Sequence, residues 1–221
     1  EKMSLDKRLA LASLGAKVVI TPNAPPTNSE NFRNVARRMA EENGWFLTDQ
    51  FCNPANVRAH QETTGAEILA QTNGCVGAFV AGAGTGGTLS GVGRKLKAAC
   101  PGVRIVLADP IGSSLADWIE TGSLGAGGSY VVEGIGGSDV PHNLQRDVLD
   151  SAERVSDEES FAMVKRLVRE EGLLVGGSAG TNVVAALRLA ARGDLNGPVV
   201  TVLPDSWDRY RAKPWMQDWT S

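Results

Sequence analysis

The stretch Phe79-Val80-Ala81-Gly82-Ala83-Gly84-Thr85-Gly86-Gly87-Thr88-Leu89-Ser90-Gly91 decides the fold of this chain. An apolar run ends abruptly in glycines and threonines, and a segment compatible with a helix follows, so the pattern predicts a strand, a tight turn and a helix. Glycines let backbone amides approach a ligand closely. The N-terminus of a helix adds free N–H groups and the positive end of a dipole. The stretch is therefore suited to hold an anion, and we expect a phosphate group.

The same glycines leave other interpretations open. Many glycine turns between a strand and a helix bind nothing, and Gly82, Gly84 and Gly87 also satisfy the G-x-G-x-x-G pattern of dinucleotide-binding folds. Asp109 ends the next apolar run, about where those folds place the acid that binds the ribose. On these residues alone, a nicotinamide cofactor and an oxidoreductase remain an alternative.

Composition and charge narrow the classes of protein. The 221 residues are 42% hydrophobic and 21% charged, which is the balance of a globular protein. A net charge of −3 gives no general attraction to nucleic acid or to an anionic membrane. No apolar run approaches the roughly 20 residues of a membrane helix, and no signal peptide opens the chain. We therefore expect a cytoplasmic protein without nucleic-acid or membrane partners.

The cysteines and histidines do not suggest a metal site. Cys52, Cys75 and Cys100 have no metal-ligand spacing, their number is odd, and only two histidines accompany them. We therefore expect neither a bound metal nor a disulfide framework. The chain begins with Glu1 in mid-pattern, which suggests a fragment or a processed form of a longer protein.

Helices and strands are expected to alternate along the chain. Helical spacing, caps and terminating glycines predict helices at 5–14, 31–43, 62–71, from the glycine turn to 100, and at 115–120, 157–172 and 182–192. Apolar and β-branched runs predict strands at 17–20, 45–47, 76–80, 104–108, 173–175 and 199–203. This order indicates an α/β fold of open, mainly parallel sheets with flanking helices. A polar crossing at 49–56 separates a small domain, 1–47, from a large one, 48–221.

Three glycine clusters follow predicted strands, at 82–88, 134–137 and 176–181. A dinucleotide-binding fold needs one such cluster. A planar cofactor with a phosphate arm explains three better, because one loop would hold the phosphate, another would approach the ring and a hydroxyl would meet a ring nitrogen. Ser178 lies between a predicted strand and a predicted helix, where that hydroxyl would be held rigidly, although an ordinary helix cap is the alternative for it.

Several motifs, in the same order along the whole chain, resemble the cystathionine β-synthase and cysteine synthase family. The matching segments are 1–4 (EKMS), 50–56 (QFCNPAN), 63–65 (TTG), 84–88 (GTGGT), 133–136 (EGIG), 172–180 (GLLVGGSAG) and 203–206 (LPDS). The resemblance implies a truncated fold-type II enzyme with pyridoxal 5'-phosphate as its cofactor. It also makes Asp109 a structural residue at the end of a strand and removes most support for a nicotinamide cofactor.

The resemblance assigns roles to individual residues. It implies that the cofactor phosphate binds to the amides and hydroxyls of Gly84, Thr85, Gly86, Gly87 and Thr88. It places Gly134 beside the cofactor, Ser178 at the pyridine nitrogen and Gln50 at the α-carboxylate of the substrate. A neutral hydroxyl at the pyridine nitrogen limits the electron sink, which favours β-elimination and β-replacement.

The family's catalytic lysine forms a Schiff base with the cofactor, and its motif lies upstream of Glu1 in the family pattern. None of the lysines in this chain lies in such a motif; they are Lys2, Lys7, Lys17, Lys95, Lys97, Lys165 and Lys213. We therefore expect no catalytic residue within these 221 residues, and we expect this piece alone to be inactive.

For the full-length protein, the expected activity is a β-replacement on serine or an activated serine by a thiol or sulfide. The motifs at 1–4 and 130–134 favour cystathionine β-synthase, whereas the motif at 50–56 favours cysteine synthase, and Gly137 leaves the second substrate open. A protein of another class, a non-catalytic remnant or partner-binding protein without the lysine, remains an alternative. The resemblance also implies a homodimer.

Overall fold

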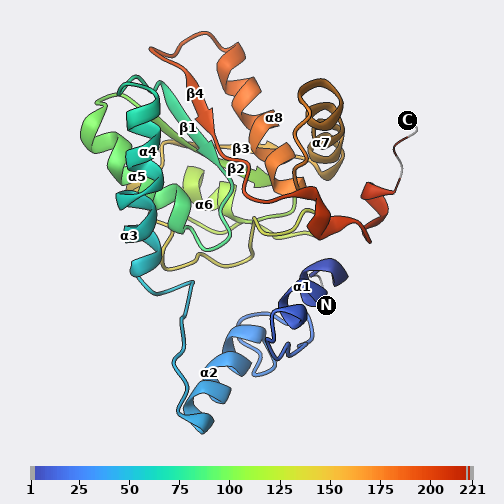
Figure 1. Ribbon diagram of the computed structural model, residues 1–221. Coiled ribbons are helices and arrows are strands. Elements are labelled where there is room, and N and C mark those ends of the chain that lie inside the picture. The colour runs from blue at the N-terminus through green and yellow to red at the C-terminus, as the bar shows by residue number, and fades with distance from the viewer. Residues whose placement is uncertain (1–2, 218, 220–221) are drawn as a thin grey trace. The chain divides into compact units, whose positions relative to one another are not determined.

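The computed structural model describes residues 3–217 and 219 and divides into two compact units (Figure 1). Unit 1 combines Glu1–Asp49 with Trp207–Ser221, and unit 2 is Gln50–Ser206. Glu1 and Lys2 of the EKMS motif lie outside the described residues. Within the described part, no helix is long and apolar enough to cross a membrane.

Unit 2 is built on a parallel sheet of four strands in the order β3-β2-β1-β4. The strands are β1 (Ala78–Ala81), β2 (Arg104–Pro110), β3 (Ser151–Val155) and β4 (Val199–Thr201). The central strand β1 pairs with β2 through Val80 and Val106 and with β4 through Val80 and Thr201. Because all four strands run the same way, their carboxyl ends lie at one edge of the sheet. The glycines after β1 start at that edge.

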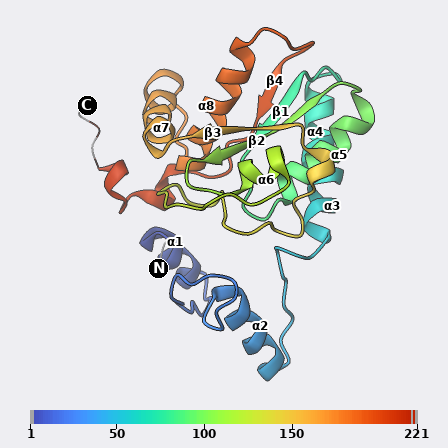
Figure 2. The same ribbon diagram turned by 180° about the vertical axis from the view of Figure 1, so that it is seen from behind.

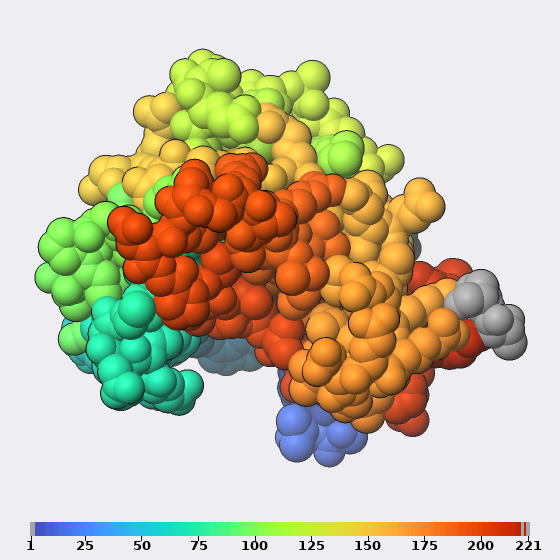
Figure 3. All heavy atoms as spheres, turned by 90° about the horizontal axis from the view of Figure 1, so that it is seen from above, coloured from blue at the N-terminus to red at the C-terminus, as the bar shows by residue number. Residues whose placement is uncertain are grey.

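Helices cover both faces of this sheet. They are α3 (Ala55–Glu62), α4 (Thr64–Gln71), α5 (Gly87–Ala99), α6 (Leu115–Thr121), α7 (Asp157–Glu171) and α8 (Gly177–Ala191). Figures 1 and 2 show α3, α4 and α5 on one side of the sheet and α7 and α8 on the other. Seen from above, the end of α8 and the segment that follows it form an outer surface of this unit (Figure 3). The layering is that of an α/β fold, as the sequence predicts.

The main core lies between the sheet and α5. Phe79 is fully buried there with Leu89 and Leu96 of α5 and Ile105 and Leu107 of β2. Successive residues of a strand point to opposite faces, so Val80 and Val106, which are also fully buried, face α8. Strands buried on both faces explain why the apolar runs in the sequence are continuous rather than alternating.

Unit 1 contains helices but no strand among its described residues. Its helices are α1 (Leu5–Ser13) and α2 (Phe32–Asn43), and short 3-10 turns follow at Trp207–Tyr210 and Pro214–Met216. The hydroxyl of Ser4 donates to the carbonyl of Arg209 at 2.6 Å, and Lys7 Nζ donates to Tyr210 Oη at 2.7 Å. The two ends of the chain thus meet within this unit.

Several element predictions are wrong in detail. Residues 17–20, 45–47 and 173–175 do not form strands; Val175 makes only a single bridge to Ser206. The sequence missed β3, whose residues lack an apolar run, and it took the beginning of α3 for a crossing. The helix expected at 182 begins at Gly177, so Ser178 lies in its first turn instead of between a strand and a helix.

Candidate cofactor site

The glycine turn after β1 presents backbone amides that no protein group uses. Gly86, with φ of 83°, precedes α5 in the left-handed conformation that glycine adopts without strain. Among the described residues, no hydrogen bond is donated by the amides of Gly84, Thr85, Gly86 and Thr88. The first N–H groups of a helix have no partner inside it. Together with the helix dipole, these amides form a site for an anion.

The second glycine cluster lies directly against this turn. A Cβ added to Gly84 would lie 2.3 Å from the carbonyl oxygen of Gly134, so only glycine fits there. The amide of Gly136 donates to the carbonyl of Ala83 at 2.9 Å. Gly134 itself is exposed, with φ of 87° and open space where a side chain would point. The structure therefore brings two of the three predicted clusters together.

Two asparagines hold the backbone of Gln50, and one of them also bonds the turn. Asn56 Nδ2, at the start of α3, donates to Thr85 Oγ1 at 3.0 Å and to the carbonyl of Gln50 at 2.9 Å. Asn143 Nδ2 donates to the same carbonyl at 2.9 Å. These bonds hold the backbone of Gln50 close to the glycine turn, and the side chain of Gln50 is exposed. The sequence analysis did not single out either asparagine, although Asn56 ends the 50–56 motif.

Ser178 faces the same edge of the sheet from α8. Residues four apart lie on one face of a helix, and Asn182, four residues after Ser178, accepts a hydrogen bond from the amide of Gly82 at 2.8 Å. Ser178 is 3% exposed, and among the described residues its hydroxyl has no protein partner. This hydroxyl is suited to meet a polar atom of a ligand.

Thr88 is the last residue assigned to the phosphate, and a chain of hydrogen bonds leads from it to α4. Thr88 Oγ1 lies 3.1 Å from His60 Nε2, and His60 Nδ1 lies 3.0 Å from Thr64 Oγ1. Burial lowers the pKa of His60 below its usual value of 6.5. Near neutral pH the imidazole is therefore uncharged, with one nitrogen as donor and the other as acceptor.

Asp109 serves the fold rather than the glycine turn. It is fully buried in β2, and its Oδ2 accepts from the amide of Ala116 at 2.8 Å in the first turn of α6. Burial raises the pKa of Asp109 to about 6, against the opposing effect of the Ala116 amide and the Ser113 hydroxyl. The Asp109 carboxylate is buried and one of its oxygens binds the start of α6, in agreement with the structural role predicted for it.

These features fit a planar ligand with a phosphate arm. The open amides and the Thr85 and Thr88 hydroxyls suit the phosphate, the side-chain-free surface at Gly134 admits a flat ring, and the Ser178 hydroxyl can meet a ring nitrogen. No group of three or more histidine, cysteine or acidic side chains within residues 3–217 and 219 is placed to hold a metal ion. The residues present therefore fit pyridoxal 5'-phosphate.

Comparison with known proteins places the chain in a family. Residues 1–205 match the family described as pyridoxal-phosphate dependent enzyme, and the chain belongs to this family. Its cofactor is accordingly pyridoxal phosphate, as the sequence predicted.

Curated relatives confirm the narrower resemblance. Cystathionine beta-synthase of Oryctolagus cuniculus is 44% identical over 216 residues, which are 96% of this chain and 39% of that protein. Cysteine synthase 1 of Emericella nidulans is 44% identical over 95% of this chain and 58% of that protein. Cysteine synthase of Staphylococcus aureus is 38% identical over 97% of this chain and 67% of that protein. The chain thus spans between about two fifths and two thirds of these relatives.

A solved structure supports the fold. The crystal structure of O-ureido-L-serine synthase superposes with a TM-score of 0.85 at 33% identity, over 96% of this chain and 65% of that one. A mutant of the same enzyme with O-ureido-L-serine bound gives a TM-score of 0.83 at 35% identity, over 96% and 64% of the two chains. The expected fold-type II architecture with a parallel sheet is confirmed.

Proposed function

We propose that the protein containing this chain catalyses a pyridoxal-phosphate-dependent β-replacement on serine or an activated serine, with a thiol or sulfide as nucleophile. The observation that carries this proposal is the set of open amides at Gly84, Thr85, Gly86 and Thr88, in a turn that lies against Gly134. The relatives named cystathionine beta-synthase and cysteine synthase support the reaction class. Of the two, we favour a cystathionine β-synthase-like activity, with cysteine synthase as the alternative.

Each residue of the proposed site has a task. Gly84, Thr85, Gly86, Gly87 and Thr88 bind the phosphate and thereby fix the position of the cofactor ring. Bound pyridoxal phosphate supplies an electron sink for negative charge at the α-carbon of an amino acid. The neutral hydroxyl of Ser178 donates to, or accepts from, the pyridine nitrogen. This contact limits how strongly the pyridine ring withdraws electrons.

Two further positions complete the proposed site. Gln50, held near the turn by Asn56 and Asn143, binds the α-carboxylate of the substrate. The open surface at Gly134 leaves space for the amino acid beside the ring. No lysine of this chain takes part in the chemistry; Lys97, for example, is engaged with Asp150 at 2.7 Å. An enzyme of this kind has amino-acid and thiol or sulfide substrates.

The setting of the protein belongs to the same proposal. We infer a cytoplasmic homodimer without nucleic-acid or membrane partners, in which residues 1–47 are the remainder of a small domain and 48–221 belong to the large cofactor-binding domain. A non-catalytic, partner-binding protein that binds the cofactor without turnover is the alternative of another class. Mapping the lysine that carries a pyridoxyl group after borohydride reduction distinguishes the two, because a remnant would carry none.

The site assignment is tested with a pair of matched glycine variants. Gly86→Ala puts a Cβ about 2.5 Å from the backbone of Leu144 at a left-handed position, whereas Gly44→Ala enters open space at another left-handed position. We expect Gly86→Ala to weaken pyridoxal phosphate binding at least tenfold in a fluorescence titration. Gly44→Ala costs about 1–2 kcal/mol of folding free energy, because alanine disfavours the left-handed conformation, and should leave binding unchanged.

The ring-nitrogen contact has its own readout. Ser178→Ala should shift the absorption band of the bound cofactor and lower the rate of β-replacement, while the affinity for inorganic phosphate stays the same. An unchanged spectrum together with an unchanged rate would remove Ser178 from the site. Assays with homocysteine and with sulfide then decide between the cystathionine β-synthase and cysteine synthase alternatives.

A further inference from the structure

His60 is held between two threonine hydroxyls that belong to different helices. It lies near the end of α3, Thr64 begins α4, and Thr88 lies in the first turn of α5. Its Nε2 is 3.1 Å from Thr88 Oγ1, and its Nδ1 is 3.0 Å from Thr64 Oγ1. Both ring nitrogens are therefore used, and the imidazole connects the proposed phosphate ligand to a residue outside the site.

Close packing of α3 against α5 fixes this arrangement. A Cβ added to Gly91, one turn after Gly87 on α5, would lie 2.3 Å from the carbonyl oxygen of Val57 and 2.8 Å from His60 Cβ. The two helix backbones approach each other so closely at this point that only glycine fits. The imidazole therefore has little freedom to move away from Thr88.

The direction of the hydrogen bonds follows from what Thr88 has to do. A hydroxyl has one donor and two acceptor positions, and a phosphate offers only acceptors. If Thr88 donated to His60, its lone pairs would face the phosphate and repel it. If His60 Nε2–H donates to Thr88 Oγ1, the hydroxyl proton of Thr88 remains available for the phosphate. A neutral imidazole protonated at Nε2 then has Nδ1 as an acceptor, and the Thr64 hydroxyl must donate to it.

We propose that His60 is a positioning residue of the phosphate site, whose Nε2–H directs the Thr88 hydroxyl toward the cofactor phosphate, and that Thr64 selects the required tautomer. This inference rests on the proposed function, because it takes Thr88 as a phosphate ligand. The hydrogen bonds from Thr64 to His60 and from His60 to Thr88 are formed before any ligand binds, so the site is preorganised for a group that accepts hydrogen bonds. These hydrogen bonds do not raise the affinity for a ligand without a phosphate.

The test compares pyridoxal phosphate with pyridoxal, which lacks the phosphate, on the full-length protein. Without His60, the Thr88 hydroxyl is no longer directed to the phosphate. A hydrogen bond to a charged group contributes about 1.5–3 kcal/mol, so His60→Leu should weaken binding of pyridoxal phosphate by roughly tenfold to a hundredfold. The affinity for pyridoxal should not change. His60→Gln, whose amide can still donate toward Thr88, should recover most of the loss, and His142→Leu, at an exposed position, is the control.

A second readout is the tautomer of His60, which is measured in the protein without any ligand. In ¹⁵N-histidine-labelled protein, the resonances of His60, assigned by their loss in His60→Gln, should show the Nε2–H tautomer without any ligand. Thr64→Val removes the donor to Nδ1 while keeping the shape of the side chain, so it should populate the other tautomer and weaken pyridoxal phosphate binding, whereas Thr64→Ser should do neither.

The outcomes separate this inference from the proposed function. If the unmodified protein binds neither pyridoxal phosphate nor pyridoxal, the proposed function fails. If it binds pyridoxal phosphate and His60→Leu binds it equally well, or weakens both ligands by the same factor, the positioning role is overturned while the proposed function stands. An Nδ1–H tautomer in the unmodified protein also overturns it.

Discussion

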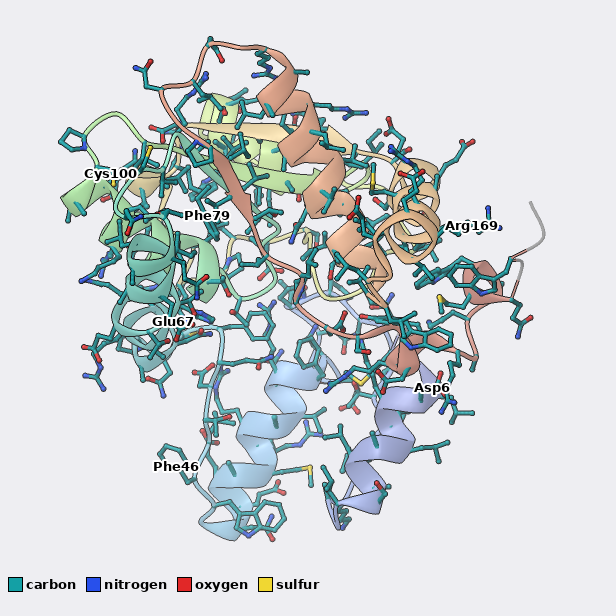
Figure 4. The ribbon with its side chains drawn as sticks, turned by 45° about the horizontal axis from the view of Figure 1, so that its top comes forward. Asp6, Phe46, Glu67, Phe79, Cys100 and Arg169 are labelled. Atoms are coloured by element: carbon teal, nitrogen blue, oxygen red, sulfur yellow. The ribbon has the colours of Figure 1, made fainter. Side chains whose placement is uncertain are left out.

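Similar sequence segments adopt different structures in the two units. Residues 17–20 of unit 1 and residues 76–80 of unit 2 are both short apolar runs with β-branched side chains, yet only the second produces a strand. Phe79 in unit 2 is 0% exposed, whereas Phe46 in unit 1 is 85% exposed. Figure 4 shows Phe79 enclosed by the sheet and its helices and Phe46 directed away from the ribbon of its own unit.

The difference shows that a strand depends on its neighbours more than on its own residues. A helix satisfies its backbone within itself, but a strand needs partners on adjacent strands. In unit 2, β1 has β2 on one side and β4 on the other. Among the described residues of unit 1 no strand offers such a partner, and its apolar runs form no strand and are mostly exposed.

The largest expected effect comes from truncating the two phenylalanines. Phe79→Ala should lower the free energy of unfolding by about 3–5 kcal/mol, because it leaves a cavity in the core of unit 2. Phe46→Ala should change it by less than about 0.5 kcal/mol, since its side chain is already exposed. Urea unfolding of both variants measures the difference. A loss above 2 kcal/mol for Phe46→Ala would show that this side chain is buried in solution.

The sequence predicted most of unit 2 because its local signals agree with its tertiary contacts. The run at 76–80, the glycines after it and the capping residues Ser156 and Glu159 each specify one structure, and the packing supports it. Strand β3 was missed because it lies at the edge of the sheet, and its residues include the half-buried Glu153 and the exposed Arg154. Edge strands do not need an apolar run.

The candidate site was predictable where the motif residues themselves form it. The turn at 84–88, Gly134 and Ser178 converge on one edge of the sheet, and the resemblance to a known family named all of them. Asn56, Asn143 and His60 were not singled out, because an isolated polar residue carries no periodicity. Their tasks depend on which helices meet, and only the packed structure shows that.

Unit 2 also buries a titratable group, Asp109, and the pH dependence of stability tests this burial. The pKa of Asp109 is raised by burial from 3.8 to about 6. The folded protein therefore holds a proton that the unfolded chain releases, so the stability contributed by this group is present below pH 3.8 and is lost as the pH rises to about 6. A shift of this size corresponds to about 3 kcal/mol at most.

The variant Asp109→Asn isolates this effect, because its amide oxygen can still accept from the Ala116 amide. Relative to the unmodified protein, it should gain stability steadily as the pH is raised from 4 to 6. Glu159→Gln is the control of opposite sign. The Ser156 amide and other partners lower the pKa of Glu159, so that its contribution is present above pH 4.5 and is lost on acidification. A stability difference between Asp109→Asn and the unmodified protein that does not vary with pH would show that Asp109 is solvated.

The smallest effect concerns the helix caps, and here the two units should agree. In unit 1, Asn31 Oδ1 accepts from the amide of Arg33 at 3.0 Å at the start of α2. In unit 2, Ser156 Oγ accepts from the amide of Glu159 at 3.2 Å, and Glu159 Oε2 accepts from the amide of Ser156 at 3.0 Å. A cap is a local interaction that needs no sheet. Replacement of either capping residue by alanine should therefore cost about 1 kcal/mol.

Amide hydrogen exchange read separately for α2 and α7 measures both costs and also shows how the units are coupled. If each unit unfolds by itself, Asn31→Ala accelerates exchange in α2 alone and Ser156→Ala accelerates it in α7 alone. If the units unfold as one, either variant accelerates exchange in both helices. If Asn31→Ala caused no loss of stability, α2 would already be open in the unmodified protein. Unit 1 would then differ from unit 2 in its helices as well as in its strands, and the contrast drawn from Phe46 and Phe79 would extend to the whole unit.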